Sequence, residues 1–193
     1  MTHDFVVREH RTIYRGHRFS FVEDEVVMPG DGTAERVYLE HPGAVVVAPV
    51  DDAGRVALIH QYRHPARQRL WELPAGLRDV DGEEPAVTAA RELAEEIDMR
   101  AGRMEHLMSV YPSPGCNSER IELFAASALT PVPEAERHTR TDEEADLTLR
   151  WWDLDEAVAA VMAGKIHNGM TVIGLLALAR RAVDAPAPSQ SSL

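Results

Sequence analysis

Apolar side chains recur at intervals of three or four residues between positions 85 and 97, which predicts an amphipathic helix. The members of this apolar stripe are Ala86, Ala90, Leu93, Ala94 and Ile97. At about 100° per residue, Glu92, Glu95 and Glu96 fall on the opposite side of the helix. We therefore expect an apolar face against the core and three carboxylates on an exposed face.

The chain begins with the pattern of a small antiparallel β unit. Extended segments are predicted at Phe5–Arg8, Phe19–Met28 and Arg36–His41, with a turn at Pro29–Gly32. We expect residues 1–41 to form an N-terminal β extension in front of the main domain.

Strand and helix patterns follow one another along the main domain, residues 42–182. Gly43–Val50 is a Val-rich run and Arg55–Arg63 alternates after a turn, so these two segments are predicted to pair as a hairpin. The other expected strands and helices are Leu70–Leu73, Met104–Tyr111, Arg120–Ala126, Leu147–Trp152, Leu154–Ala163 and Met170–Ala182. Residues 183–193 are rich in Pro and Ser, which predicts a disordered tail.

Composition and charge narrow the class of protein. Of 193 residues 45% are hydrophobic, enough for a core, and the net charge of −12 argues against nucleic acid or an anionic membrane as a partner. The single cysteine, Cys116, excludes an intrachain disulfide and indicates a reducing cytoplasm. No signal peptide is visible, and the apolar run Met170–Ala179 is too short to span a bilayer.

Glu92, Glu95 and Glu96 crowd three negative charges into little more than one helical turn. Such carboxylates repel one another unless a cation lies between them, and oxygen ligands of this kind suit Mg²⁺ or Mn²⁺. An acidic helix face is also typical of an ordinary solvated surface. The spacing of the flanking residues favours the metal site.

That spacing resembles the Nudix box, a loop–helix–loop signature of hydrolases that act on nucleoside diphosphates linked to another group. The matching positions are Gly76, Glu83, Arg91, Glu92, Leu93, Glu95, Glu96 and Met99. Two features depart from the family pattern. The loop Leu77–Gly82 is one residue longer than usual, and Asp98 stands where Gly usually ends the helix. We expect local strain at Asp98, because Asp adopts the left-handed conformation less readily than Gly.

The resemblance implies an α/β fold, the Nudix α/β/α sandwich with a mixed central sheet between helices. Further segments resemble the ADP-ribose pyrophosphatase branch of the family, and they are Gln61–Arg63, Trp71–Gly76, Ser113–Glu119 and Asp142–Asp146. In that branch an N-terminal β unit exchanges between subunits. The resemblance therefore implies a homodimer in which residues 1–41 are swapped.

The resemblance also assigns roles to individual residues. The implied metal ligands are the backbone carbonyl of Ala75 and the carboxylates of Glu92, Glu95 and Glu96. The implied substrate-binding residues are Arg63, Glu72, Ser113, Gly115 and Glu119. Arg63 would clamp the phosphates through its planar fork, and the less favoured alternative is a surface charge at a strand end. Glu72 would pair with a cation, Glu119 would accept hydrogen bonds from the terminal ribose, and Arg91 would orient the carboxylates.

A catalytic base is expected outside the helix, because metal-bound carboxylates have committed lone pairs and a lowered pKa. Related hydrolases of this branch place a catalytic Glu on the loop before the last strand, here the acidic segment ahead of Leu147. The resemblance implies Glu144, with Glu143 as the alternative, although composition alone favours a solvated acidic loop. Glu96 is expected to be catalytic through the metal.

The function implied is Mg²⁺-dependent hydrolysis of ADP-ribose to AMP and ribose 5-phosphate by a cytoplasmic homodimer. Three alternatives stay open. The substrate could be another diphosphate, such as a nucleotide sugar or NADH. The protein could bind ADP-ribose without cleaving it, or it could be a purely structural dimer; the three Glu residues argue against a binder that does not hydrolyse.

Overall fold

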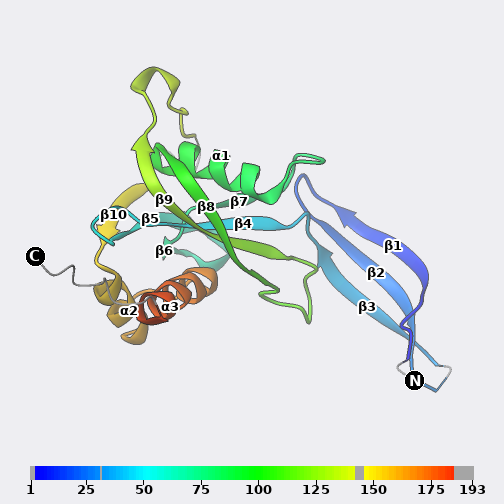
Figure 1. The fold of residues 1–193 in the computed structure, drawn as a ribbon. Coiled ribbons are helices and arrows are strands. Elements are labelled where there is room, and N and C mark those ends of the chain that lie inside the picture. Colours follow the sequence, from blue (N-terminus) through cyan, green and yellow to red (C-terminus); the bar gives the residue numbers. More distant parts are fainter. Residues whose placement is uncertain (1–2, 31, 142–145, 185–193) are drawn as a thin grey trace, which may run out of the picture.

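An antiparallel sheet at the N-terminus stands apart from the rest of the protein. A computed structural model describes residues 3–30, 32–141 and 146–184 of the chain (Figure 1). Strands β1 (Val7–Arg15), β2 (Ser20–Val27) and β3 (Thr33–Glu40) pair in that order to form what we call the N-terminal sheet. The three predicted strands are present, and the first lies later and is longer than expected.

The main domain contains two further sheets. In the first the order is β7-β4-β9-β8, and its members are β4 (Ala44–Pro49), β7 (Ala75–Leu77), β8 (Met99–Val110) and β9 (Ile121–Pro131). Strands β4 and β9 run parallel while the other pairs are antiparallel, so this sheet is mixed, as expected. The second is antiparallel with the order β10-β5-β6, and comprises β5 (Val56–Arg63), β6 (Gln68–Glu72) and β10 (Thr148–Trp152).

The predicted hairpin of Gly43–Val50 with Arg55–Arg63 is wrong. Both segments are strands, β4 and β5, but they lie in different sheets and are joined only by an isolated bridge between Val50 and Val56. All six residues of β4 are buried, and its two edges pair with β7 and β9. A strand buried on both faces belongs at the centre of a sheet, and its sequence neighbour must then pair elsewhere.

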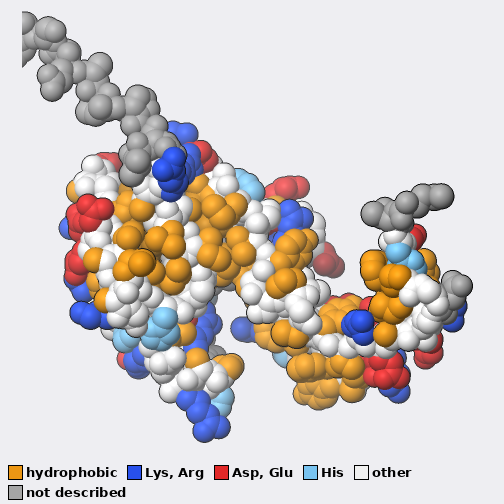
Figure 2. Space-filling model, turned by 90° about the horizontal axis from the view of Figure 1, so that it is seen from below, with side chains coloured by type: hydrophobic (Ala, Val, Ile, Leu, Met, Phe, Trp, Pro, Cys, Tyr) orange, Lys and Arg blue, Asp and Glu red, His pale blue; other side chains and the backbone are white. Residues whose placement is uncertain are grey.

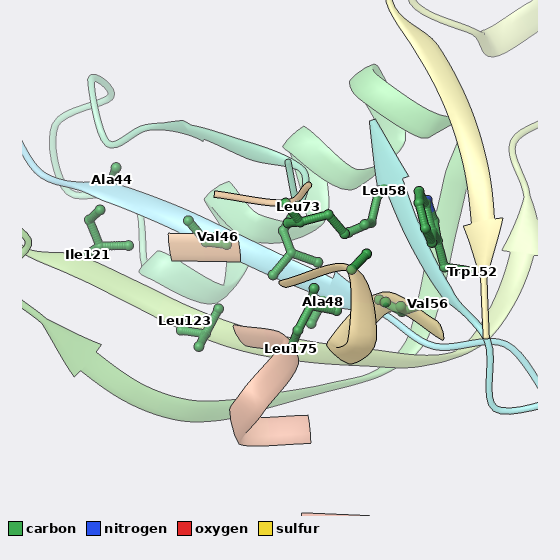
Figure 3. Packing of buried hydrophobic residues seen from close by; sticks show 13 residues of the cluster. Ala44, Val46, Ala48, Val56, Leu58, Leu73, Ile121, Leu123, Trp152 and Leu175 are labelled. Atoms are coloured by element: carbon green, nitrogen blue, oxygen red, sulfur yellow. The ribbon is translucent and has the colours of Figure 1, made fainter. Parts of the chain in front are cut away.

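Helices cover the mixed sheet on both faces, which confirms the expected sandwich (Figure 1). Helix α1 (Pro85–Ile97) packs against one face, where Leu93 contacts the cluster of Val45, Val47 and Phe124. Helices α2 (Leu154–Met162) and α3 (Gly169–Asp184) cover the other face, and Figure 3 shows Leu175 of α3 beside Leu123. Successive side chains of β4 point to opposite faces of the sheet, so Val45 packs in the cluster under α1 and Val46 in the cluster on the other face.

The C-terminal helix is longer than predicted. Helix α3 ends at Asp184, two residues later than expected, and residues 185–193 of the predicted tail lie outside the described part of the chain. Asp153 caps the N-terminus of helix α2, and its side chain accepts hydrogen bonds from the backbone N–H groups of Asp155 and Glu156. Among the described residues, none of the helices is both long and apolar enough to cross a membrane.

Candidate active site

Helix α1 has the predicted bounds, and Leu93 and Ile97 of the predicted apolar stripe are buried, but the rest of the buried face differs from the prediction. The buried positions are Thr88, Ala89, Glu92, Leu93, Glu96 and Ile97, whereas Ala86 and Ala90 are exposed. Glu92 and Glu96 are only 9% and 4% exposed, so the expectation of an exposed acidic face is wrong for these two. The helix is rotated so that their carboxylates, and not the two alanines, face strand β7.

The close approach of β7 to α1 depends on Gly76. A Cβ at this position would lie 1.9 Å from Cδ of Glu92, so no other residue fits without displacing that carboxylate. On the same strand the backbone N–H of Ala75 donates to Oε2 of Glu96 at 2.8 Å. The two box carboxylates therefore fill the space between helix and strand, which explains why they are buried.

Arg91 is the cation at the centre of the acidic cluster. Its guanidinium lies 2.7 Å from Glu92, 3.3 Å from Glu83 and 3.4 Å from Glu95. Glu83 also accepts a hydrogen bond from the Thr88 hydroxyl at 2.8 Å, and this bond, followed by Arg91, holds the pKa of Glu83 below its ordinary value. Four members of the Nudix-like pattern thus form one network.

The donor set suits a hard divalent cation. Glu92, Glu95 and Glu96 supply carboxylate oxygens, two of these side chains are buried, and all three line the same cavity as Ala75. Within the described residues, no three acidic, His or Cys side chains converge closely enough to hold a metal in the present conformation. In this conformation Arg91 pairs with Glu92 and Glu95. Metal binding therefore requires the three carboxylates to turn toward one shared point.

Arg63 and Glu72 form an ion pair across β5 and β6 in which the carboxylate is buried and the guanidinium is partly exposed. Glu72 is 2% exposed and accepts from Arg63 Nη2 at 2.7 Å and from Gln61 Nε2 at 3.2 Å. The cation expected for Glu72 is therefore Arg63 itself. Because the carboxylate is fixed in the strand, it orients the guanidinium at the edge of the cavity, where a paired hydrogen-bond donor suits phosphate oxygens.

These groups line one cavity of about 1030 Å³. The expected site residues that line it are Arg63, Glu72, Ala75, Glu92, Glu95, Glu96, Ser113 and Glu119. Gly115 does not line it, so the structure gives no support for substrate contact there. Glu143 and Glu144 lie outside the described residues.

Residues that flank the strands of the N-terminal sheet also line the cavity, and the sequence did not reveal them. They are Arg18, Phe19 and His41. The rings of Phe19 and His41 stack with centroids 4.8 Å apart and planes inclined by 17°. Their position depends on a contact between β3 and the loop before β9, about 80 residues away in sequence. No local sequence pattern predicts this contact.

Asp98 ends α1 in the left-handed conformation, with φ 55°. Its backbone N–H donates to the carbonyl of Leu93, and its side chain accepts from Arg140 Nη2 at 2.7 Å. The unusual residue at this position of the box thus keeps the usual backbone conformation and gains an ion pair.

The fold, the Gly-dependent contact with α1 and the row of carboxylates define a Nudix-type hydrolase site. The chain matches the NUDIX domain over residues 39–171 and belongs to that family. It is 41% identical over 176 residues to an ADP-ribose pyrophosphatase of Mycobacterium tuberculosis (strain ATCC 25618 / H37Rv), covering 91% of this chain and 84% of that protein.

Two further comparisons were found. The chain is 34% identical to a methanol dehydrogenase activator of Bacillus methanolicus, covering 84% of this chain and 86% of that protein. A solved structure described as "Crystal structure of ADP compounds hydrolase" superposes with a TM-score of 0.77 at 21% identity, covering 95% of this chain and 96% of that one. At this identity the structural match establishes the shared fold.

Proposed function

We propose that this protein is a Mg²⁺-dependent pyrophosphatase that hydrolyses ADP-ribose to AMP and ribose 5-phosphate. The observation that carries the proposal is the single cavity that gathers the α1 carboxylates with Arg63 and Glu119. The 41% identity to a protein named ADP-ribose pyrophosphatase supports this substrate. The expectation of a reducing, cytoplasmic setting belongs to the same proposal.

Glu92, Glu95 and Glu96 are the proposed side-chain ligands of Mg²⁺, with Mn²⁺ as a substitute. The backbone carbonyl of Ala75 is proposed as a further oxygen ligand, because Ala75 is already hydrogen-bonded to Glu96 through its N–H. When bound, the cation would neutralise the diphosphate and lower the pKa of a coordinated water. Arg91 pairs with Glu92 and Glu95 and so orients their carboxylates.

Arg63 is the proposed clamp on the diphosphate. Its charge lies at the cavity edge, and the buried carboxylate of Glu72 limits the directions that the guanidinium can take. A group held in place before substrate arrives loses less entropy on binding, and fixed donors stabilise the charge that develops during hydrolysis. Glu72 therefore acts through Arg63.

The proposed general base is Glu144, with Glu143 as the alternative. The support is the acidic segment between Thr141, which lines the cavity, and Asp146, which pairs with Arg69 on β6. Replacing Glu144 by Gln should lower kcat by about 10² to 10⁴ with little change in KM, the loss expected for a general base. Full kcat in Glu144→Gln with a collapse in Glu143→Gln would move the assignment by one residue.

A homodimer is proposed, with the N-terminal sheet exchanged between subunits so that its side chains reach the partner's adenosine site. Exposed large apolar side chains gather on this sheet and just before it; they are Phe5, Val6, Val7, Ile13, Tyr14, Phe21 and Val37. Figure 2 shows apolar side chains along the arm that projects from the body. An exposed apolar surface of this kind marks an interface, and symmetric pairing is the commonest way to cover it.

A panel of diphosphates tests the proposed substrate. Purified protein with Mg²⁺ is offered ADP-ribose, ADP-glucose, GDP-mannose and NADH, and released phosphate monoesters are measured by coupling to a phosphatase. We expect the highest kcat/KM with ADP-ribose. A higher value with another compound would reassign the substrate. Tight binding of ADP-ribose by calorimetry without turnover would make the protein a binding module, and neither binding nor turnover would favour a structural dimer.

A further inference from the structure

His41 joins the N-terminal sheet to the loop that leads into β9. Backbone hydrogen bonds run both ways between β3 and this loop: the N–H of Leu39 donates to the Cys116 carbonyl at 2.9 Å, and the N–H of Ser118 donates to the Leu39 carbonyl at 3.0 Å. The backbone N–H of His41 then donates to the Ser118 hydroxyl at 2.9 Å. These contacts place the imidazole at the cavity wall.

The surroundings of His41 select one form of its ring. The backbone N–H of Gly43 donates to Nδ1 at 3.0 Å, so Nδ1 carries the lone pair and the proton of the neutral ring is on Nε2. The side chain is 6% exposed and stacks on Phe19. Burial lowers the pKa of His41 and outweighs the opposing effect of Glu119, which agrees with a neutral ring at pH 7.

Both carboxylate oxygens of Glu119 lie close to nitrogen atoms of other side chains. His41 Nε2 lies 3.5 Å from Oε1, and Asn117 Nδ2 donates to Oε2 at 3.3 Å. The backbone N–H of Glu119 donates in turn to Oδ1 of Asn117 at 2.8 Å. Of these two contacts to the carboxylate, the one from Asn117 has hydrogen-bond geometry, so both oxygens keep acceptor positions for a ligand in the cavity, where Glu119 is 20% exposed.

We propose that His41 is a positioning residue for substrate selection, which orients Glu119 so that this carboxylate accepts hydrogen bonds from ribose hydroxyls of the substrate. The inference rests on the proposed function, since it concerns the same cavity. It gives His41, the residue that follows β3, a part in the cavity of its own chain. A carboxylate at this place favours hydroxyl groups and repels a phosphate, so the site selects an unphosphorylated ribose.

Two substitutions of His41 separate its hydrogen bond with Gly43 from its contact with Glu119. In His41→Asn the amide oxygen can replace Nδ1 as acceptor for Gly43, but no donor reaches Glu119. In His41→Gln the amide nitrogen lies near the former Nε2. The substrates are ADP-ribose and an ADP alkyl ester that lacks the second ribose. We expect His41→Asn to raise KM for ADP-ribose roughly tenfold, with kcat nearly unchanged, and to leave KM for the ester unaltered; His41→Gln should restore most of the loss.

His106→Asn is the matched control. His106 also contacts a glutamate, with Nε2 2.7 Å from Oε2 of Glu122, and it does not line the cavity. In His106→Asn the ratio of the KM values for the two substrates should equal that of the wild type. An equal KM increase for both substrates in His41→Asn, or no increase for either, would overturn the role of His41. If the wild type releases AMP from neither compound, the proposed function itself has failed.

Discussion

Arg140 donates to two groups at the end of helix α1, the carboxylate of Asp98 at 2.7 Å and the backbone carbonyl of Glu95 at 3.0 Å. The first bond explains what Asp98 gains where Gly is usual, and the second satisfies a carbonyl that the helix itself leaves unpaired. Thr141, the next residue, lines the cavity. The pair therefore ties the cavity wall to the helix that carries the proposed metal ligands.

The conformation of Asp98 predicts that its replacement by Ala destabilises the fold more than its replacement by Gly. Asp98→Ala loses the contact with Arg140 and keeps a Cβ at φ 55°, whereas Asp98→Gly loses the contact and relieves the strain. The Ala variant should unfold with a free energy about 1 kcal/mol lower than the Gly variant, measured by urea denaturation. Equal stabilities would show that the left-handed conformation carries no strain here.

Gly76 offers a test of the contact between β7 and α1. A methyl group at position 76 would overlap the carboxylate of Glu92, so Gly76→Ala should reduce kcat/KM for ADP-ribose by at least about 10², the order of loss for a misplaced catalytic group. Gly32→Ala is the control, because a Cβ at Gly32 meets nothing within 4 Å. Near-normal activity in Gly76→Ala would mean that the carboxylate of Glu92 need not lie there.

Acid stability should depend on Glu122. Burial would raise its pKa, but hydrogen bonds from Ser109 at 2.6 Å and His106 at 2.7 Å, together with the charge of Arg120, outweigh burial and lower it. A lowered pKa stabilises the fold above the unfolded value of about 4.3, and this contribution is lost as the pH falls through the folded pKa. Glu122→Gln should unfold with a shallower pH dependence below about pH 4.3. Parallel stability curves for the two proteins would contradict this.

The apolar surface of the N-terminal sheet predicts the oligomeric state. Light scattering should give a dimer for the wild type at micromolar concentration and a monomer for Phe21→Glu, because Phe21 is 49% exposed on β2 and a buried charge there is costly. Met162→Glu, at an exposed apolar position of α2, is the control and should stay dimeric. A monomeric wild type with full activity would refute the swapped dimer.

Local features of the sequence predict some elements but not their tertiary contacts. Pro at its start and a steady helical period predict α1 with the observed bounds, but not its whole buried face, because Ala86 and Ala90 are exposed while Glu92 and Glu96 are buried. Burial of Glu92 depends on Gly76, which lies in another element. The separation of β4 from β5 depends on which strands compete for β4, and the cavity position of His41 depends on a tertiary contact. Such information is not local.

The most direct test of the account is product analysis with and without the carboxylate of Glu96. Wild type and Glu96→Gln are incubated with ADP-ribose and Mg²⁺, and products are identified by mass. Gln can still accept a hydrogen bond from the N–H of Ala75, so the fold should persist. The negative charge that binds the metal is lost. The account predicts AMP and ribose 5-phosphate from the wild type and almost none from the variant. Intact ADP-ribose in both reactions, or turnover by Glu96→Gln within tenfold of the wild type, would contradict it.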